Sequence, residues 1–254
     1  MLWVPAGLAL GLLLLPLVAL IIRAPWATLP SLLAEPTVAQ ALGLSLATAA
    51  ISMAVCLVLG IPLALVLARS ADWPAIPRRL LRALITVPLV LPPVVGGVAL
   101  LLLLGRRGLI GQWLPFTIPF TPAAVVIAQV FVSMPFLVIA VEGALRASDR
   151  RFEVAAATLG ASRFTVFRRI TLPLIAPGIA SGALLCFTRS LGEFGATITF
   201  AGSFPGTTQT LPISTYLLLQ TDPNAAIALS LVLMVVSVVV LLSLRDRWVP
   251  GALA

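Results

Sequence analysis

Six long apolar runs are the feature that most constrains this chain. They cover residues 2–22, 38–67, 83–104, 123–141, 175–200 and 225–244. An α-helix needs roughly 20 apolar residues to cross the hydrocarbon core of a bilayer. The runs lack the polar alternation of barrel strands, and a spanning segment must satisfy its own backbone hydrogen bonds. We therefore expect an all-α polytopic membrane protein, with about six transmembrane helices in a single domain, 1–254.

Composition supports a lipid environment for most side chains. The chain is 61% hydrophobic and 9% charged, whereas a soluble domain is about half apolar and a quarter charged. The first run, 2–22, has no basic segment before it and no clean cleavage site after it, so we interpret it as a retained helix and not as a signal peptide. The second run, 38–67, is longer than a bilayer requires and should tilt or begin outside it.

Prolines interrupt the third apolar run. Pro88, Pro92 and Pro93 lie within it, and Gly96 and Gly97 follow. Proline removes a backbone donor and its ring clashes with the preceding turn, whereas glycine allows helices to approach closely. We expect this run to bend or to pack tightly against a neighbouring helix.

The arginines predict the orientation of the chain. All 16 basic residues are arginines, and the net charge is +8. Twelve lie in the loops 68–82 and 142–174 or in the C-terminal tail, whereas three, Arg23, Arg106 and Arg107, lie on the other side. Because cytoplasmic loops carry the excess of positive charge, both termini and both loops should be cytoplasmic. The basic charge is thus a topology signal, and we expect no binding of nucleic acid.

The polar residues disfavour other classes of membrane protein. The chain has no His, which removes the commonest general base and metal ligand. Cys56 and Cys186 lie in apolar runs and should be buried, without a metal or disulfide role. An intramembrane enzyme needs convergent acidic or His side chains, but the eight carboxylates are scattered singly. An ion-coupled secondary transporter is a more remote alternative, because no inverted halves are visible.

The cytoplasmic loop 142–174 predicts two short helices separated by a turn. Ser148 or Asp149 can cap the first helix, and Glu153 lies near its positive end. Three consecutive alanines favour this helix and give it a flat surface, and Gly160 allows the chain to turn at its end. Such a helix suits a groove on a partner protein. On physical grounds alone, an ordinary basic loop that only sets topology is an equal alternative.

The same loop resembles the signature of binding-protein-dependent ABC importer permeases. In that pattern an Ala-rich helix is followed by a Gly, nine residues and Ile-x-Leu-Pro. The matching residues are Glu153, Ala155, Ala156, Ala157, Gly160, Ile170, Leu172 and Pro173. One departure is that Val154 stands where the family has its acidic residue, so Glu153 is turned by about 100° around the helix. The resemblance implies a type I ABC importer permease whose loop helix docks on a cytoplasmic ATPase.

A second resemblance concerns the transported substrate. Residues 189–202 resemble the fifth helix of molybdate permeases. The stretch 120–129, at the start of the fourth predicted span, and the stretch 204–216 also resemble molybdate permeases, and sulfate and thiosulfate permeases are close relatives. The resemblance implies a homodimer in the prokaryotic inner membrane, with two ATPase subunits and an extracytoplasmic oxyanion-binding protein. We expect molybdate as substrate, with tungstate, sulfate or thiosulfate as alternatives. The chain lacks a phosphate-binding Gly-rich Lys motif, so ATP and Mg²⁺ should bind the partner, and this chain should bind no cofactor.

Arg189 and Glu193 are the opposite-charge pair that we place within a predicted span. A mid-membrane charge costs roughly 2.5–3.5 kcal/mol, and the i, i+4 spacing puts both side chains on one helix face. The candidates for the translocation path are Arg189, Ser190, Glu193, Gly195, Thr197 and Thr199. The alternative is a structural ion pair between helices. We expect no catalytic residue and no metal ligand in this chain.

Overall fold

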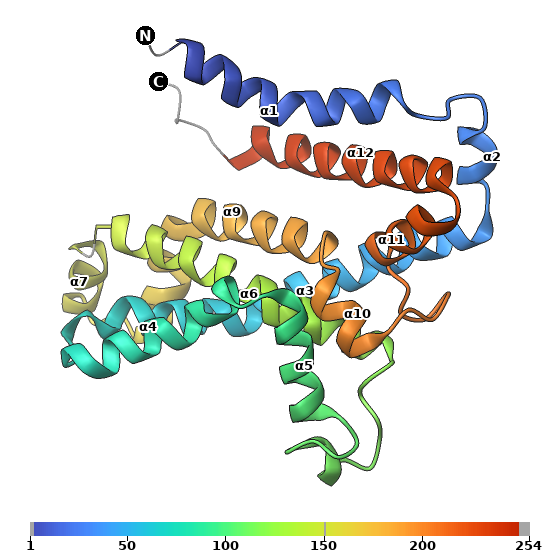
Figure 1. Ribbon diagram of the computed structural model, residues 1–254. Helices are drawn as coiled ribbons and strands as arrows, with labels where there is room; N and C mark the ends of the chain where they lie inside the picture. The colour runs from blue at the N-terminus through green and yellow to red at the C-terminus, as the bar shows by residue number, and fades with distance from the viewer. Residues whose placement is uncertain (1–2, 150, 249–254) are drawn as a thin grey trace.

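The computed structural model describes residues 3–149 and 151–248, and its regular structure is helical throughout this part of the chain (Figure 1). The long helices are α1 (Trp3–Ile22), α3 (Pro36–Arg69), α6 (Pro122–Ala147), α9 (Leu172–Leu191) and α12 (Pro223–Trp248). The shorter helices are α2 (Leu29–Leu33), α4 (Ala75–Val90), α5 (Pro93–Leu104), α7 (Arg151–Thr158), α8 (Arg163–Val166), α10 (Gly195–Ala201) and α11 (Leu211–Thr221). Single turns complete the chain at η1 (Ser70–Asp72), η2 (Gly111–Trp113) and η3 (Phe167–Thr171).

The number of spans agrees with the sequence. In the described residues, five helices are long and apolar enough to cross a membrane, and six if α4 and α5 form one broken span. The predicted all-α polytopic fold is therefore confirmed. Helix α3 has 34 residues, or roughly 50 Å at 1.5 Å per residue, which exceeds the ~30 Å of hydrocarbon. The excess length predicted for the second run is thus present.

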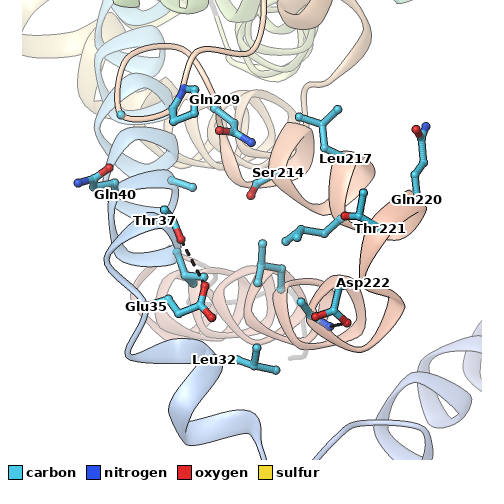
Figure 2. Close-up of a pocket in the computed structure, with 17 residues that line it drawn as sticks. Leu32, Glu35, Thr37, Gln40, Gln209, Ser214, Leu217, Gln220, Thr221 and Asp222 are labelled. Atoms are coloured by element: carbon cyan, nitrogen blue, oxygen red, sulfur yellow. Dashed lines mark hydrogen bonds between the residues drawn. The ribbon is translucent and has the colours of Figure 1, made fainter.

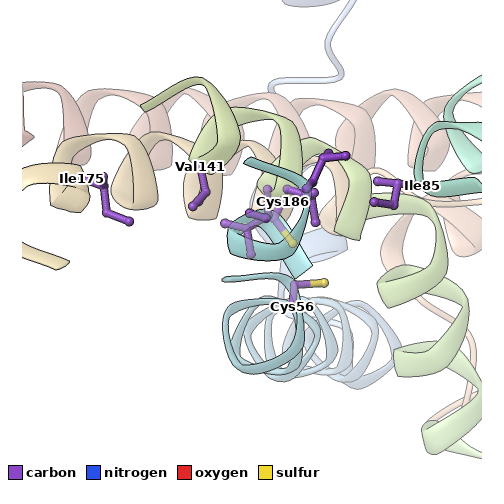
Figure 3. Close-up of a cluster of buried hydrophobic side chains, with 9 residues drawn as sticks. Cys56, Ile85, Val141, Ile175 and Cys186 are labelled. Atoms are coloured by element: carbon purple, nitrogen blue, oxygen red, sulfur yellow. The ribbon is translucent and has the colours of Figure 1, made fainter. Parts of the chain in front are cut away.

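Helices α3, α6 and α9 pack together as the core of the molecule. Their buried side chains, with Ile85 of α4, form a cluster that contains both cysteines (Figure 3). Cys56 and Cys186 are buried and free, as expected. Lipid tails are as apolar as these side chains, so close van der Waals packing stabilises this contact more than exclusion of water does. Accordingly, Gly178 and Gly182 of α9 lie directly against α6.

The third predicted span, 83–104, is not a single straight helix. Helix α4 ends at Val90, α5 begins at Pro93, and the two axes meet at 114°. Pro92 and Pro93 supply no backbone donors, so the helical ladder cannot continue through them. The bend predicted from the prolines is confirmed. The two following glycines also make the expected close contacts, since Gly96 lies against Phe131 of α6 and Gly97 against the backbone of α10.

The fifth predicted span, 175–200, was wrong as one continuous helix. Helix α9 ends at Leu191 and α10 begins at Gly195. Two glycines near the break, Gly192 and Gly195, have low helix propensity. A Glu193 carboxylate oxygen accepts the Ala196 N–H at 2.8 Å and so caps the new helix. Helix α11, which was not predicted, packs at this break, and its Tyr216 ring lies 4.8 Å from that of Phe194.

Candidate functional site

The loop helix predicted to contact a partner is present as α7. The Asp149 carboxylate accepts the Arg151 N–H at 2.9 Å at its start. At its end Gly160 adopts a φ of +84°, and the Ala161 N–H donates to the Ala156 carbonyl at 3.0 Å. This left-handed turn closes the helix and favours glycine. A second short helix, α8, follows. The predicted pair of helices separated at Gly160 is confirmed.

The surface of α7 is open to solvent and partly apolar. None of its residues is buried. Large apolar side chains are exposed on and beside it, namely Phe152, Val154, Leu159 and Phe164. This patch lies at the end of the molecule where α1 begins and α12 ends (Figure 1). Of the motif alanines, Ala155 and Ala157 are exposed and Ala156 is half-buried.

Glu153 points from α7 toward the membrane-spanning helices. Its Oε1 accepts a hydrogen bond from the Thr171 hydroxyl at 2.6 Å. Thr171 is buried and ends the π-helical turn η3, directly before α9. The rest of the motif lies at this junction, since Ile170 belongs to η3, and Leu172 and Pro173 begin α9. Glu153, which lies one residue before the acidic position of the family motif, therefore makes its hydrogen bond inside the protein.

A buried carboxylate lies at the same end of the molecule and was missed from the sequence. Glu142, near the end of α6, is 4% exposed. Its Oε1 forms ion pairs with Arg82 of α4 and, at 2.8 Å, with Arg146 one turn further along α6. The available signal was the i, i+4 spacing of Glu142 and Arg146. Arg189 and Glu193 are therefore not the only opposite-charge pair with i, i+4 spacing among the described residues, because Glu142 and Arg146 form a second one within α6.

The predicted pair of Arg189 and Glu193 forms at the far end of α9. Arg189 Nη1 lies 2.5 Å from Glu193 Oε2. The Arg189 side chain is 27% exposed, whereas that of Glu193 is 2% exposed. Each carboxylate oxygen thus has one partner, the guanidinium on Oε2 and the α10 backbone on Oε1. This geometry neutralises Glu193 within the protein and leaves Arg189 as the member of the pair that reaches the surface.

Ser190 belongs to a buried row of hydroxyl groups between α3, α6 and α9. Its hydroxyl lies 3.1 Å from that of Ser52 and 2.8 Å from that of Ser133. The row continues along α3 and α6, where the Gln129 amide donates to the Thr48 hydroxyl at 3.2 Å. These contacts were not predicted. They hold the three core helices together by interhelical hydrogen bonds.

The other path candidates lie against α5 and α6. Gly195 approaches Pro93 so closely that a Cβ would lie 2.9 Å from its side chain. Thr199 donates to the Gly195 carbonyl at 2.8 Å, and its Cβ packs on Gly97. Thr197 is fully buried, and its hydroxyl has no partner among the described residues. The six candidates therefore do not face one common space, and their path role stays a prediction.

A cavity of about 430 Å³ opens at the end of the molecule opposite α7 (Figures 1 and 2). It lies between α2, α3, α11 and α12, and its walls carry the carboxylates of Glu35 and Asp222 beside the amides of Gln40, Gln209 and Gln220. Among the residues that the structure describes, no arginine lines it. Two carboxylates without a facing cation repel an anion, so this cavity is not suited to an oxyanion.

Comparison with known proteins places this arrangement among transport proteins. The family of the binding-protein-dependent transport system inner membrane component matches residues 60–250. The molybdenum transport system permease protein ModB of Mycobacterium tuberculosis is 53% identical, over 96% of this chain and 93% of its own length. ModB of Escherichia coli is 42% identical over 82% of this chain and 92% of its own. The sulfate transport system permease protein CysT of Escherichia coli is 35% identical, over 92% of this chain and 86% of its own length.

Solved structures show the same fold at low sequence identity. A chain of a bacterial ABC transporter involved in alginate import superposes with a TM-score of 0.70 at 18% identity, covering 96% of this chain and 94% of that one. A chain of an inward-facing methionine ABC transporter superposes with a TM-score of 0.66 at 18% identity, covering 82% of this chain and 93% of that one. This chain therefore belongs to the family of binding-protein-dependent transport system inner membrane components.

Proposed function

We propose that this chain is the membrane-spanning permease subunit of an ATP-driven importer, with molybdate as its substrate. The observation that carries the proposal is the 53% identity, over nearly the whole chain, to a molybdenum transport system permease. It is supported by the loop motif, which folds into an exposed helix followed by the Gly160 turn. The chain itself catalyses no reaction and serves as the transport subunit.

We propose that α7 docks on a cytoplasmic ATPase subunit. The exposed apolar side chains of Phe152, Val154 and Leu159 form the kind of surface that marks a contact between proteins. A homodimer of this chain presents two such helices and so takes two ATPase subunits. ATP and Mg²⁺ bind to those subunits, and this chain holds no cofactor or metal.

The proposed orientation puts the α7 end of the molecule in the cytoplasm of a prokaryotic cell, with the chain in the inner membrane. The arginine-rich loops lie at this end, in accord with the positive-inside rule. The opposite end, with α2 and α11, then faces an extracytoplasmic oxyanion-binding protein. The arginines serve topology and ion pairing, so no nucleic acid is bound.

We propose that the anion passes between two copies of the chain and that Arg189 is the charged residue that it meets. Arg189 is partly exposed, and Glu193, which neutralises it, is buried. The path then carries a partly compensated positive charge, which attracts a dianion without holding it tightly. The binding protein supplies most of the discrimination among tetrahedral dianions.

Deletion of the gene tests the substrate. The deletion strain should lose molybdenum-enzyme activity at low external molybdate and regain it at high molybdate, through other carriers. Plasmid-borne wild-type chain should restore the activity at low molybdate. The similarity to CysT makes sulfate the second candidate. A requirement for reduced sulfur in that strain, with normal molybdenum content, would assign the chain to sulfate import.

A further inference from the structure

Helix α7 is attached to the rest of the protein by few contacts. It has no buried residue. In the described part of the chain, one side-chain hydrogen bond joins it to the membrane-spanning helices, from the Thr171 hydroxyl to Glu153. The helix also packs against α8 and η3. Any displacement of α7 relative to the bundle must therefore stretch, bend or break this one bond.

The two faces of α7 differ in their exposure to solvent. Glu153 and Ala156, three residues apart on one face, are half-buried, whereas Phe152, Val154 and Ala157 are exposed. A partner that covers the exposed apolar side chains thus leaves the carboxylate on the inner side. The Thr171–Glu153 bond is charge-assisted, and at 2.6 Å it falls within the short range for a hydroxyl that donates to a carboxylate.

Thr171 stands at an unusual point of the backbone. It ends the π-helical turn η3, in which the Leu172 N–H donates to the Phe167 carbonyl, five residues back. Single π turns are rare and occur often at functional positions. Pro173 accounts for this one, because its ring would clash with the carbonyl four residues earlier in an α-helix, and a wider turn relieves the clash. From this turn α9 runs without interruption to Leu191.

We propose that the Glu153–Thr171 hydrogen bond is a strut through which movement of α7 displaces α9. This proposal rests on the docking of α7 to an ATPase. In it Glu153 is a positioning residue that acts inside the permease and does not contact the ATPase. Displacement of α9 then reaches its far end, where Arg189 pairs with Glu193 and the chain breaks into α10. The strut thus connects the site of ATP-driven movement with Arg189, a partly exposed charge near the proposed path.

Two substitutions of the same residue test the strut. Thr171→Val keeps the shape of the side chain and removes the donor, and Thr171→Ser keeps the donor as the matched control. Both are measured in proteoliposomes with the complete importer, as ATP hydrolysed and molybdate transported in the same sample. A charged hydrogen bond of ordinary strength corresponds to roughly a tenfold change in an equilibrium. We expect Thr171→Val to lower molybdate transported per ATP hydrolysed about tenfold, and Thr171→Ser to stay within about twofold of wild type.

Glu153→Ala removes the acceptor from the other side. Because α7 has no buried residue, this variant folds even if Thr171→Val does not. It should lower the coupling ratio as Thr171→Val does, and the double variant should be no worse than either single one. The ATPase should co-purify with every variant as it does with wild type, because the strut does not form the docking surface.

Three results would overturn the strut. The first is a wild-type coupling ratio in Thr171→Val or in Glu153→Ala. The second is loss of ATPase co-purification in Glu153→Ala with retention in Thr171→Val, which would place Glu153 in the docking surface. The third is failure of the ATPase to co-purify with the wild-type chain, which overturns the proposed docking and the strut together and is recognised without any variant.

Discussion

At the scale of single residues, the structure shows how buried carboxylates are paired in this protein. Glu142 and Glu193 are each almost fully buried, and each is paired with arginine side chains that reach the surface. A buried charge without a partner is strongly unfavourable, whereas a partly exposed arginine that loses its partner can still be hydrated. Removal of the arginines should therefore lower the free energy of unfolding more than removal of the buried carboxylate with which they pair.

Glu142 and its arginines give the clearest test of this asymmetry. Glu142→Gln leaves Arg82 and Arg146 half-exposed to water and should cost about 1 kcal/mol. The double substitution Arg82→Gln with Arg146→Gln leaves the buried carboxylate alone and should cost about 3–5 kcal/mol. Thermal unfolding of the purified protein in detergent shows which variant loses more stability. A larger loss in Glu142→Gln than in the arginine double variant would contradict this explanation.

Arg189 and Glu193 carry a prediction about transport. Glu193→Gln keeps a carbonyl oxygen to cap α10 and leaves the path positive, whereas Arg189→Gln strands a buried carboxylate and leaves the path negative. We expect Glu193→Gln to retain more molybdate uptake than Arg189→Gln, by roughly tenfold, which corresponds to ~1.4 kcal/mol. The measurement is the initial rate in proteoliposomes, normalised to folded protein. If both single variants lost uptake equally and the double variant recovered it, the pair would have a structural role and no electrostatic role in the path.

At the scale of helices, the sequence predicts the long spans and their bends but not every break. Apolar length is a local property, and the prolines at 92 and 93 act on their own backbone, so α1, α3 and the bend between α4 and α5 follow from the sequence. The break after Leu191 depends on distant partners, since Glu193 caps the next helix and Phe194 packs on α11. Likewise α6 continues beyond the predicted end at Val141 to Ala147, and the partner of Glu142 in this extension includes Arg82 from another helix.

The same distinction applies to the candidate site. The motif from Glu153 to Pro173 is local, and its helix, its turn at Gly160 and the start of α9 were predictable from it. The hydroxyl row of Ser52, Ser133 and Ser190 joins three helices. No spacing within one span shows which serines meet across an interface, so these contacts required the three-dimensional structure.

The contact between α6 and α9 gives a prediction at this scale. Gly178→Ala would place a methyl group against the Ala144 side chain, so the helices would have to separate, and overpacking of this kind costs about 1–3 kcal/mol. Gly143→Ala, on α6, meets open space and should be neutral or stabilising by up to about 1 kcal/mol through helix propensity. Thermal unfolding compares the two identical substitutions. Equal midpoints would refute close packing at Gly178.

At the scale of the whole molecule, the chain is polarised from end to end. The end that carries α7 also holds the start of α1 and the end of α12, and most arginines gather there (Figure 1). The other end has the acidic cavity between α2, α3, α11 and α12.

The gathering of arginines at one end of the molecule predicts which loops face the cytoplasm. A cytoplasm-active reporter fused after Asp72 or Ala161 should be active, and one fused after Trp113 or Pro223 should be inactive. Activity after Trp113 would contradict a broken span formed by α4 and α5.

If this chain is the permease of an ATP-driven molybdate importer, transport by the reconstituted importer should depend on ATP and on the binding protein. The chain is reconstituted into liposomes with its ATPase subunit enclosed and its binding protein outside, and entry of labelled molybdate is followed with and without internal ATP. We expect uptake that requires both ATP and the binding protein. Excess unlabelled molybdate should abolish this uptake, whereas the same concentration of sulfate should leave it largely unchanged. Uptake without ATP, or competition by sulfate as strong as by molybdate, would contradict this function.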